Sequence, residues 1–463
     1  MEKLNYSSLP VFADADVVVC GGGTAGAFAA IAAAREGADV LLIEQFGGLG
    51  GTATNGLVTP VMRSHIPGEV LCSYITEELT ARLVAQNACT EDGRQFDPTM
   101  LKMELEAMAV EAGVRLLYHT FIPEVVVESG VVKAVVIANK AGLSLVTGRI
   151  FIDCTGDGDI CVRAGAEYNK GNPETGINQP MSLRYILDGV DVEEWGKFFE
   201  EIKQKTGVNS AASAWGHGSY VYAHCCRGND VTLTPVFNAA VDAGDLTEED
   251  HLYWQAFSMP GRLGSVAFNC PEFFVHIDGT SPEDLTLAQV KGKEAIKRQL
   301  AFYKKYMRGF DNAYIAEIAV MVGVRESREI VTDYVMKPED LLNKTKFADG
   351  ICQSNYPIDI HGKVLINDYN NLHPDDKRPW YDIPYRALLV KGLSNLMVAG
   401  RCLGAEFLVE SSLRVQHSAR ASGEAAGIGA AMALRQNVEP RQIDGADVRG
   451  VMIAKGAKFV PME

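Results

Sequence analysis

The chain has 463 residues, of which 47% are hydrophobic and 22% charged, a composition typical of a globular protein with a large core and two or three domains. Its formal net charge of −16 argues against a nucleic-acid surface and against an anionic membrane as partners. No segment reaches the roughly 18 uncharged apolar residues of a membrane span, and the ten cysteines include no C-x-x-C pair, so we expect a cytoplasmic protein.

Residues 16–43 predict a strand, a glycine turn, a helix and a second strand. The β-branched run at 16–20 is typical of a buried parallel strand, and an alanine-rich helix is expected over 25–34. Between them lies the pattern G-x-G-x-x-G, formed by Gly21, Gly23 and Gly26. In such a turn the first glycine permits the bend, the second lets a pyrophosphate approach the backbone, and the third lets the helix pack on its strand.

The same stretch predicts a dinucleotide site. The N-terminus of the helix offers unsatisfied N–H groups and about half a positive charge to a phosphate. Glu44 follows the second strand, 40–43, where a carboxylate can accept both ribose hydroxyls of an adenosine. Further cofactor contacts are expected from Gly22, Thr24, Ala25 and Gln45.

A second glycine-rich turn follows at 47–56 and contains Gly50, Gly51 and Thr52. A second turn beside the phosphates fits a long cofactor, because it can run along the pyrophosphate towards a flavin. The pattern therefore favours FAD over NAD.

The next elements are expected to complete the first domain, residues 1–167. Helices are predicted over 69–88 and 100–112, the second with Asp97 as its cap and Pro98 in its first position. A three-stranded meander follows over 114–127, broken near Pro123, then 131–138 and 143–153. Its last strand leads into Thr155, Gly156 and Asp157, which should return to the cofactor cleft.

A change in composition at about residue 168 predicts an inserted mixed α+β substrate domain over 168–345. Helices are expected at 282–307, opened by a Ser-Pro-Glu-Asp cap signal that begins at Ser281, and around 312–322. Residues 346–463 are expected to rejoin the first domain, with a strand ending at Gly400 and Arg401 and an Ala/Gly-rich helix over 411–434. The N-terminus of that helix would stabilise the negative charge of a reduced flavin. The alternative is a buried alanine-rich helix without a ligand.

These motifs occur together with 323–328, 356–361, 384–386 and the run NLMVAGR…SLRV…GEAAG at 395–427. Together they resemble the FAD-dependent oxidoreductases of the glutathione-reductase-like class with two dinucleotide-binding domains, and more narrowly a bacterial group with this C-terminal signature. The resemblance implies an adenine end on Glu44 and on the backbone near Phe121 and Ile122. It places the flavin end near Gly50 to Thr52, Arg401, Leu413 and Arg414.

Three departures from the family pattern matter. Arg401 stands where many members of the wider class carry an acid that holds the ribityl chain, and Glu329 stands where the narrow group would have a second basic residue. Residues 51–56 contain no histidine for covalent attachment, so we expect noncovalent FAD.

The chemistry predicted is hydride transfer between a small anionic organic substrate and FAD, with an unidentified electron acceptor or donor. A disulfide reductase is disfavoured, because a second G-x-G-x-x-G and a redox C-x-x-x-x-C are both missing. The catalytic candidates are Arg325, His361 and Arg386, since arginine binds both carboxylate oxygens and histidine can take a proton as hydride leaves.

Structural alternatives remain for each candidate. Arg325 and Arg328 could pair with Glu326, Glu329 or Asp333 to fix the domain joint, Arg414 could contact flavin or cap its helix, and His361 could be a satisfied structural histidine.

No metal is expected, because His217, His224, Cys225, Cys226 and His276 match no zinc spacing. Competing functions are a flavin-binding protein without turnover and, less favoured, RNA modification or thiazole synthesis. The sequence leaves the oligomeric state open, a homo-oligomer included.

Overall fold

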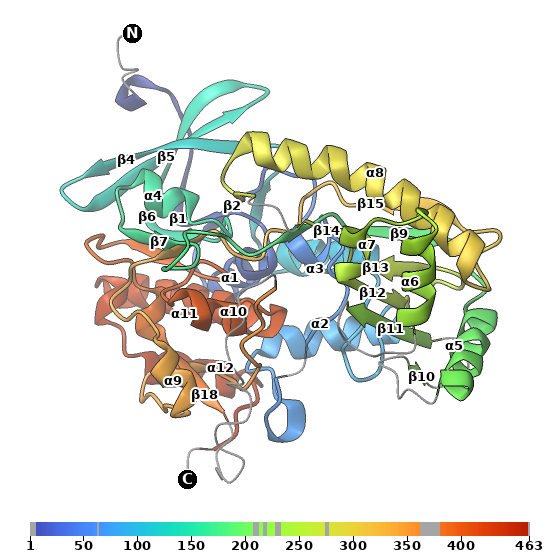
Figure 1. Ribbon diagram of the computed structural model, residues 1–463. Helices are drawn as coiled ribbons and strands as arrows, with labels where there is room; N and C mark the ends of the chain where they lie inside the picture. The colour runs from blue at the N-terminus through green and yellow to red at the C-terminus, as the bar shows by residue number, and fades with distance from the viewer. Residues whose placement is uncertain are drawn as a thin grey trace.

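The computed structural model describes residues 6–62, 64–206, 213–215, 220–226, 233–273, 277–361 and 380–461. Figure 1 shows two main layers of β-structure, one at each end of the molecule, with the long helix α8 (Pro282–Tyr306) running from the middle of the molecule along the top of the second layer.

The first sheet has the strand order β3-β2-β1-β6-β5-β4, with β19 paired to β6. Its strands are β1 (Val11–Cys20), β2 (Val40–Ile43), β3 (Arg115–Leu117), β4 (Phe121–Glu128), β5 (Val131–Asn139), β6 (Gly142–Asp153) and β19 (Leu396–Val398). Strands β1, β2, β3, β6 and β19 pair in parallel, whereas β4, β5 and β6 form an antiparallel meander. This arrangement confirms the predicted α/β fold with a Rossmann-like core and a three-stranded meander.

Helix α1 (Thr24–Arg35) packs against α11 (Gln416–Gln436), which Figure 1 shows in red beside it. The backbones approach so closely that a Cβ added at Gly423 would lie 2.1 Å from the carbonyl oxygen of Ala25. A Cβ at Gly427 would lie 2.2 Å from that of Ala29. The small residues expected to face a neighbour therefore form the contact between two helices that are almost 400 positions apart in the chain.

Two predicted elements of this part divide differently in the structure. The helix expected over 411–434 is two helices, α10 (Phe407–Leu413) and α11, because Val415 between them is extended, with φ −70° and ψ 151°. The strand expected over 114–127 breaks at 118–120 rather than near Pro123. Strand β3 pairs with β2 and β4 pairs with β5, so the two halves have different partners, and Pro123 lies inside β4 where the register shifts.

The predicted helix caps are confirmed. Asp97 precedes α3 (Pro98–Glu111), and its carboxylate accepts the backbone N–H of Thr99 at 2.8 Å. Ser281 precedes α8, and its hydroxyl accepts the N–H of Asp284 at 3.2 Å. Each contact satisfies a helix donor that would otherwise lack a partner.

The second sheet is antiparallel and has the order β10-β11-β12-β13-β9-β15. Its strands are β9 (Tyr185–Asp188), β10 (Ser213–Trp215), β11 (Tyr220–Cys226), β12 (Tyr253–Ser258), β13 (Val266–Phe268) and β15 (Tyr314–Ile318). The helix expected around 312–322 is wrong, because 314–318 pairs with β9 as an edge strand. Helices α5 (Val192–Thr206), α6 (Thr234–Asp242) and α7 (Glu248–Leu252) complete this part. The boundaries at 167 and 345 stay predictions.

Short elements connect the two parts. Three two-stranded ladders join β7 (Tyr168–Lys170) to β16 (Arg328–Ile330), β8 (Met181–Ser182) to β14 (Glu272–Phe273), and β17 (Gly350–Ser354) to β18 (Tyr381–Pro384). The other helices are α2 (Tyr74–Ala85), α4 (Asp159–Arg163), α9 (Pro338–Leu342) and α12 (Gly445–Ala454). Among the helices in the described ranges, none combines the length and apolar character needed to cross a bilayer.

Glu424 of α11 binds the N-terminus of α2 from inside the core. Its carboxylate accepts the Ser73 hydroxyl at 2.6 Å and the N–H groups of Ile75 at 3.1 Å and Tyr74 at 3.3 Å. Burial raises the pKa of Glu424 to about 7, although these hydrogen bonds oppose the shift. A carboxyl in the core therefore ties the C-terminal helix to a helix of the first hundred residues.

This pKa predicts a pH-dependent stability. Between the unfolded pKa of about 4.5 and the folded pKa of about 7, the native state keeps a proton that the unfolded state has lost. The contribution of Glu424 to the free energy of unfolding should therefore fall as pH rises through this window, by on the order of 3 kcal/mol. Urea unfolding at pH 5 and pH 8 should show that Glu424→Gln removes this part of the pH dependence. Parallel curves for the two proteins would contradict the prediction.

Candidate functional site

The turn between β1 and α1 forms an open cradle at the N-terminus of α1. Gly21 has φ +95°, and a Cβ there would lie 2.6 Å from the carbonyl oxygen of Cys154. A Cβ at Gly26 would lie 1.8 Å from the carbonyl oxygen of Gly21. At Gly23, in contrast, an added Cβ meets nothing closer than 3.8 Å, and no side chain caps the helix. The N–H groups of the first helical turn therefore face space that an anion can enter.

The second glycine turn lies directly against the first. The N–H of Gly50 donates to the carbonyl of Gly22 at 2.9 Å, and the Thr24 hydroxyl donates to the carbonyl of Gly50 at 3.1 Å. A Cβ at Gly51 would lie 2.7 Å from the Cα of Gly23. The structure thus brings together the two turns that the sequence predicts to hold one cofactor.

Glu44 is fixed at the end of β2. Its Oε2 accepts the N–H of Gly22 at 2.6 Å and its Oε1 accepts the N–H of Phe46 at 2.8 Å. Burial raises the pKa of this carboxyl, while the backbone hydrogen bonds act in the opposite direction. Glu44 therefore stands at the carboxyl edge of the parallel sheet, where the expected ribose would lie.

A cavity of about 900 Å³ runs from Glu44 past the cradle and into the space beneath the second sheet. Predicted residues that line it are Gly23, Thr24, Ala25, Glu44, Gln45, Gly51, Thr52, Thr155, Gly156, Asp157, Arg325, His361, Gly400, Arg401 and Arg414. Gly21, Gly22, Gly26 and Gly50 shape the two turns from behind.

Three expected cofactor contacts do not line the cavity. Phe121 is 47% exposed on β4, whereas Ile122 and Leu413 are buried in the core. The chain that approaches Glu44 is the bend before β4, where the N–H of Thr120 donates to the carbonyl of Glu44 at 3.1 Å. The cofactor contact that the resemblance implies near Phe121 and Ile122 stays a prediction.

Arg401 joins the end of β19 to the turn after β6. Its Nε donates to the carbonyl of Gly156 at 2.8 Å, its Nη2 pairs with Asp157 at 2.5 Å, and its Nη1 donates to the carbonyl of Val324. Asp157 also accepts the Ser327 hydroxyl at 2.6 Å. The arginine that departs from the family pattern is thus held by an acid of the neighbouring turn.

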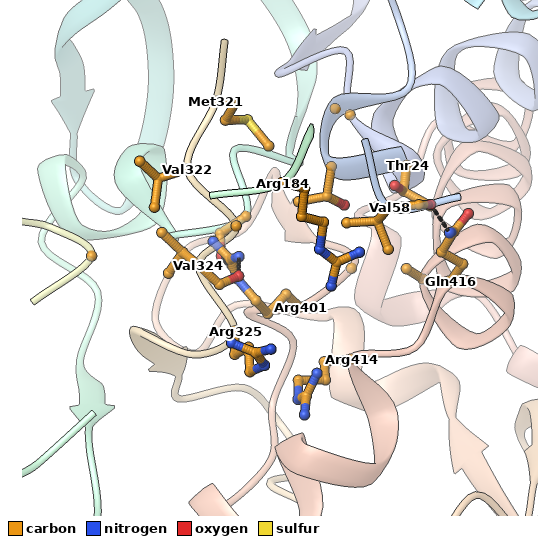
Figure 2. A pocket seen from close by; sticks show the side chains of 18 of the residues that line it. Thr24, Val58, Arg184, Met321, Val322, Val324, Arg325, Arg401, Arg414 and Gln416 are labelled. Carbon is orange, nitrogen blue, oxygen red and sulfur yellow. Dashed lines mark hydrogen bonds between the residues drawn. The ribbon is translucent and has the colours of Figure 1, made fainter. Parts of the chain in front are cut away.

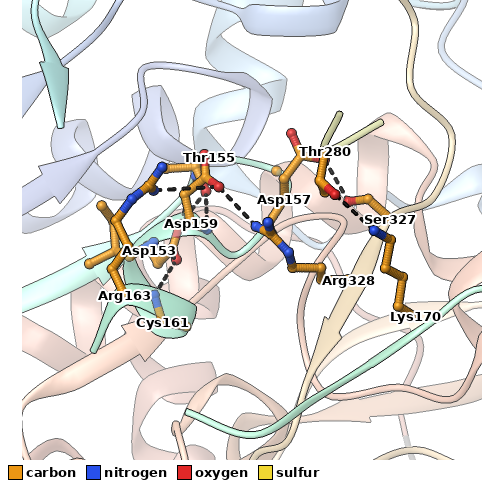
Figure 3. A network of polar contacts seen from close by, with 12 residues as sticks. Asp153, Thr155, Asp157, Asp159, Cys161, Arg163, Lys170, Thr280, Ser327 and Arg328 are labelled. Carbon is orange, nitrogen blue, oxygen red and sulfur yellow. Dashed lines mark hydrogen bonds and ion pairs between the residues drawn. The ribbon is translucent and has the colours of Figure 1, made fainter. Parts of the chain in front are cut away.

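Figure 3 shows how this turn is tied to the segment 325–328. Arg328 pairs with Asp159 at 2.9 Å and donates to the carbonyl of Asp157 at 3.1 Å. Beneath them, the buried Asp153 accepts the N–H groups of Thr155, Ile160 and Cys161. Arg328 therefore fixes the joint between the two parts, as one of the alternatives proposed, although its partner is Asp159 and not an acid of its own segment.

Arg325 and His361 share one buried carboxylate. Glu272 of β14 pairs through Oε1 with the Arg325 guanidinium and with Nδ1 of His361, the latter at 2.9 Å. Burial would raise the pKa of Glu272, but the charges of Arg325 and His361 lower it. The Nε2 of His361 lies 3.4 Å from Asp359, whose other oxygen is 3.2 Å from Arg414. Two acids thus position two arginines and a histidine at the cavity wall.

Arg184 is the arginine of this wall for which the described residues offer no paired acid. It precedes β9, is 8% exposed, and its Nε and Nη1 have no hydrogen-bond partner in the described part of the chain. Figure 2 shows its guanidinium in the cavity, on the side where Arg325, Arg401 and Arg414 gather. Burial, reinforced by the charge of Arg325, lowers the pKa of Arg184 to about 9. An anion in the cavity would supply the missing partner.

Sequence reasoning missed Arg184 and the polar residues near it, namely Tyr253, Gln255, Asn269, Glu272 and Gln416. Arg184 stands in the run MSLRYILDGV, which has no motif and reads as an ordinary strand. The available signal was a lone arginine in an apolar run. Without knowledge of how β9 pairs, nothing in the sequence connected this arginine to the cavity.

Arg386 is not brought to the cavity. Its guanidinium is 48% exposed, pairs with Asp349 at 2.8 Å and lies over the ring of Tyr334 at 5.1 Å. The sequence placed it in the site because it follows an ordered Pro-Tyr, but the short turn after β18 directs it outwards.

Arg386→Gln should therefore leave function intact. We expect kcat/KM and bound FAD within about twofold of the native protein, and a loss of less than about 1 kcal/mol in the free energy of unfolding, because exposed ion pairs contribute little. Steady-state kinetics and flavin absorbance measure these quantities. A loss of tenfold or more would return Arg386 to the site.

The metal candidates are only partly covered by the structure. His217 and His276 lie outside the described residues, as do the side chains of His224 and Cys226. The Sγ of Cys225 is 3.6 Å from Nε2 of His251. Within the described ranges, no three His, Cys, Asp or Glu side chains are grouped to hold a metal ion.

Known proteins are similar to this chain in sequence and in structure. The family model described as FAD dependent oxidoreductase matches residues 16–452. The thiamine thiazole synthase of Aeropyrum pernix is 32% identical over 218 residues, which cover 42% of this chain and 73% of that protein. The thiamine thiazole synthase of Methanococcus aeolicus is 30% identical over 155 residues, covering 31% and 55%. Among solved structures, L-proline dehydrogenase from P. horikoshii aligns over 93% of this chain and 95% of its own, with 12% identity and a TM-score of 0.43.

Proposed function

The chain belongs to the FAD dependent oxidoreductase family, and from this premise we propose that it transfers a hydride between a small organic carboxylate and noncovalent FAD. The family establishes the cofactor and the class of enzyme. The substrate, the direction of the reaction and the electron partner are the proposal, and the buried, unpaired Arg184 is the observation that carries it.

The residues present fit FAD. The open cradle at Gly23, the uncapped N-terminus of α1 and the adjoining turn at Gly51 would hold the pyrophosphate. Glu44 would take the ribose, and the cavity continues from there to Arg401 and to the N-terminus of α11 at Gln416. When bound at that end, the flavin supplies an acceptor or donor of two electrons and a proton.

The cavity favours an anionic substrate. Arg325, Arg401 and Arg414 each face a carboxylate of the protein, namely Glu272, Asp157 and Asp359. Arg184 has no such partner, and a buried cation without one is costly. A substrate carboxylate would accept two parallel hydrogen bonds from its planar guanidinium and neutralise it.

His361 is the group proposed to move the proton. It lines the cavity, and Glu272 holds its Nδ1 so that the ring keeps one orientation. When a hydroxyl or amine is oxidised, its proton leaves to a base while the hydride leaves the neighbouring carbon, and the imidazole can take that proton. In the reverse direction His361 would return it.

The test is to mix the FAD-loaded protein anaerobically with small hydroxy acids, amino acids, polyols and uncharged alcohols. Reduction of the flavin is followed by its absorbance. Bleaching confined to carboxylates supports the proposal, whereas bleaching by uncharged compounds alone would contradict it. His361→Gln should slow the reduction about a hundredfold. The dissociation constant of the His361→Gln protein for an unreactive carboxylate should stay within about threefold of the native value, since Arg184 is unchanged. A large loss of binding with an unchanged rate would assign His361 to binding.

The similarity to thiamine thiazole synthases raises a second activity, the formation of a thiazole. That similarity covers 42% of this chain at most. Hydride transfer to or from a carboxylate is the better supported proposal, because it rests on Arg184 and His361, which line the cavity.

A further inference from the structure

One row of polar side chains forms the part of the cavity wall next to Arg184. In the second sheet Phe268 stands opposite Ala256 of β12 on one side and Tyr185 of β9 on the other. One residue further, the same register places Asn269 between Gln255 and Arg184, and the N–H of Asn269 donates to the carbonyl of Gln255 at 2.8 Å. Cross-strand neighbours have Cβ atoms about 4.5–5.5 Å apart. All three residues line the cavity.

The amide of Asn269 is oriented by its neighbours. Its Nδ2 donates to Oε1 of Gln255 at 2.8 Å and to the hydroxyl of Tyr253 at 3.0 Å. Its Oδ1 is buried and has no partner among the residues that the structure describes. A buried acceptor without a donor costs stability, so this oxygen calls for a hydrogen-bond donor.

We propose that this row selects a 2-hydroxy carboxylate, with the carboxylate on Arg184 and the adjacent hydroxyl donating to Oδ1 of Asn269. The inference rests on the proposed function and narrows its substrate class. Both unsatisfied groups belong to the same row of the cavity wall. One requires an anion and the other a hydrogen-bond donor, which a carboxylate and a hydroxyl on the next carbon supply together.

Charge separates a hydroxy acid from an amino acid. The arginines of the described wall carry one positive charge in excess, because Arg325, Arg401 and Arg414 each face an acid and Arg184 does not. A 2-hydroxy carboxylate carries one negative charge and neutralises that excess. A zwitterionic amino acid has no net charge and would bring a second cation beside Arg184 and Arg325, so it should bind less tightly.

In the oxidative direction the reaction balances. The C2–H bond would break with its electron pair passing to the FAD of the family, the hydroxyl proton would turn from Oδ1 of Asn269 to His361, which would accept it, and the C2–O bond would become a carbonyl. The product is a 2-oxo carboxylate, which offers Asn269 an acceptor in place of a donor and should leave more readily than the substrate.

Binding can be measured without turnover by using acids in which no C2–H bond stands beside a hydroxyl or an amine. Isobutyrate, 2-hydroxyisobutyrate and 2-aminoisobutyrate share one skeleton and cannot deliver a hydride. Titrated into the FAD-loaded protein by calorimetry, 2-hydroxyisobutyrate should bind about tenfold more tightly than either of the others. In Asn269→Leu the hydroxyl preference should fall to within about twofold, with isobutyrate affinity little changed. Asn312→Leu, at an exposed position of the same part, should keep the native preference.

The outcomes distinguish the two proposals. Equal affinities in the native protein, or tightest binding of the amino acid, would overturn the hydroxy-acid inference while leaving carboxylate oxidation in place. Failure of all three acids to bind would overturn the proposed function itself. If Asn269→Leu keeps the preference for the hydroxy acid, a group other than Asn269 must bind the hydroxyl. Flavin absorbance checks that each variant is folded and loaded, and the native comparison needs no variant.

Discussion

Arg184→Met should lower kcat/KM for a carboxylate substrate by about a thousandfold, roughly 4 kcal/mol. Among the described residues no carboxylate is paired with the buried guanidinium, so its charge is available to the substrate, and methionine fills a similar volume without it. The same change should leave the free energy of unfolding unchanged or raise it by about 1–3 kcal/mol, because an unpaired buried cation is removed. Steady-state kinetics and urea unfolding measure the two effects.

The control for Arg184 is Arg308→Met. Arg308 is an exposed arginine of the same part and pairs with Glu201 at 2.9 Å. It should keep native kinetics. An Arg184→Met protein that loses stability and activity together would mean that the arginine serves the fold, and the anionic substrate would lose its main support.

Gly23→Ala should raise the dissociation constant of FAD about a thousandfold while the protein without cofactor keeps its fold. A Cβ at this position meets no protein atom within 3.8 Å, so the empty structure accommodates it. The methyl group would instead occupy the space in which a pyrophosphate approaches the N-terminus of α1. The flavin-to-protein absorbance ratio after purification, and fluorescence titration with FAD, measure the loss.

Substitutions at two other glycines serve as controls for this prediction. Gly450 of α12 has open space at its Cβ, so Gly450→Ala should bind FAD as the native protein does. Gly26→Ala would place a Cβ 1.8 Å from the carbonyl oxygen of Gly21 and should disrupt the turn even without cofactor. If Gly23→Ala copurified with a full complement of FAD, the cradle would not be where the phosphates bind.

Local signals predicted the cofactor half of the site. The glycines of the first turn, Glu44 after β2 and the caps at Asp97 and Ser281 each act within a few residues, and the structure places them as expected. The same locality explains the errors. The run at 314–318 carries alanine and apolar residues at spacings that fit a helix, and only its pairing with β9, more than 120 residues earlier, makes it a strand.

The substrate half could not be predicted in the same way. Arg184 precedes β9, Asn269 follows β13 and Glu272 lies in β14, and no motif marks these segments. They meet through the register of β9 with β13 and of β8 with β14. Arg386 shows the opposite case. It belongs to a Pro-Tyr-Arg motif that suggested a site residue, yet its side chain is exposed to solvent. Side-chain direction at these positions depends on pairing between distant segments.

The pairing of β19 with β6, and the seating of α11 on α1, have a consequence for synthesis. When the ribosome has made the first 390 residues, the nascent chain holds its phosphate cradle, but the alanine face of α1 is bare and one edge of β6 is open. The part of the cavity wall formed by 399–401 and 414–416 is also missing at that stage, so we expect FAD to bind only after these residues have emerged. Until then the polypeptide presents an apolar helix surface and a free strand edge, the features that chaperones bind.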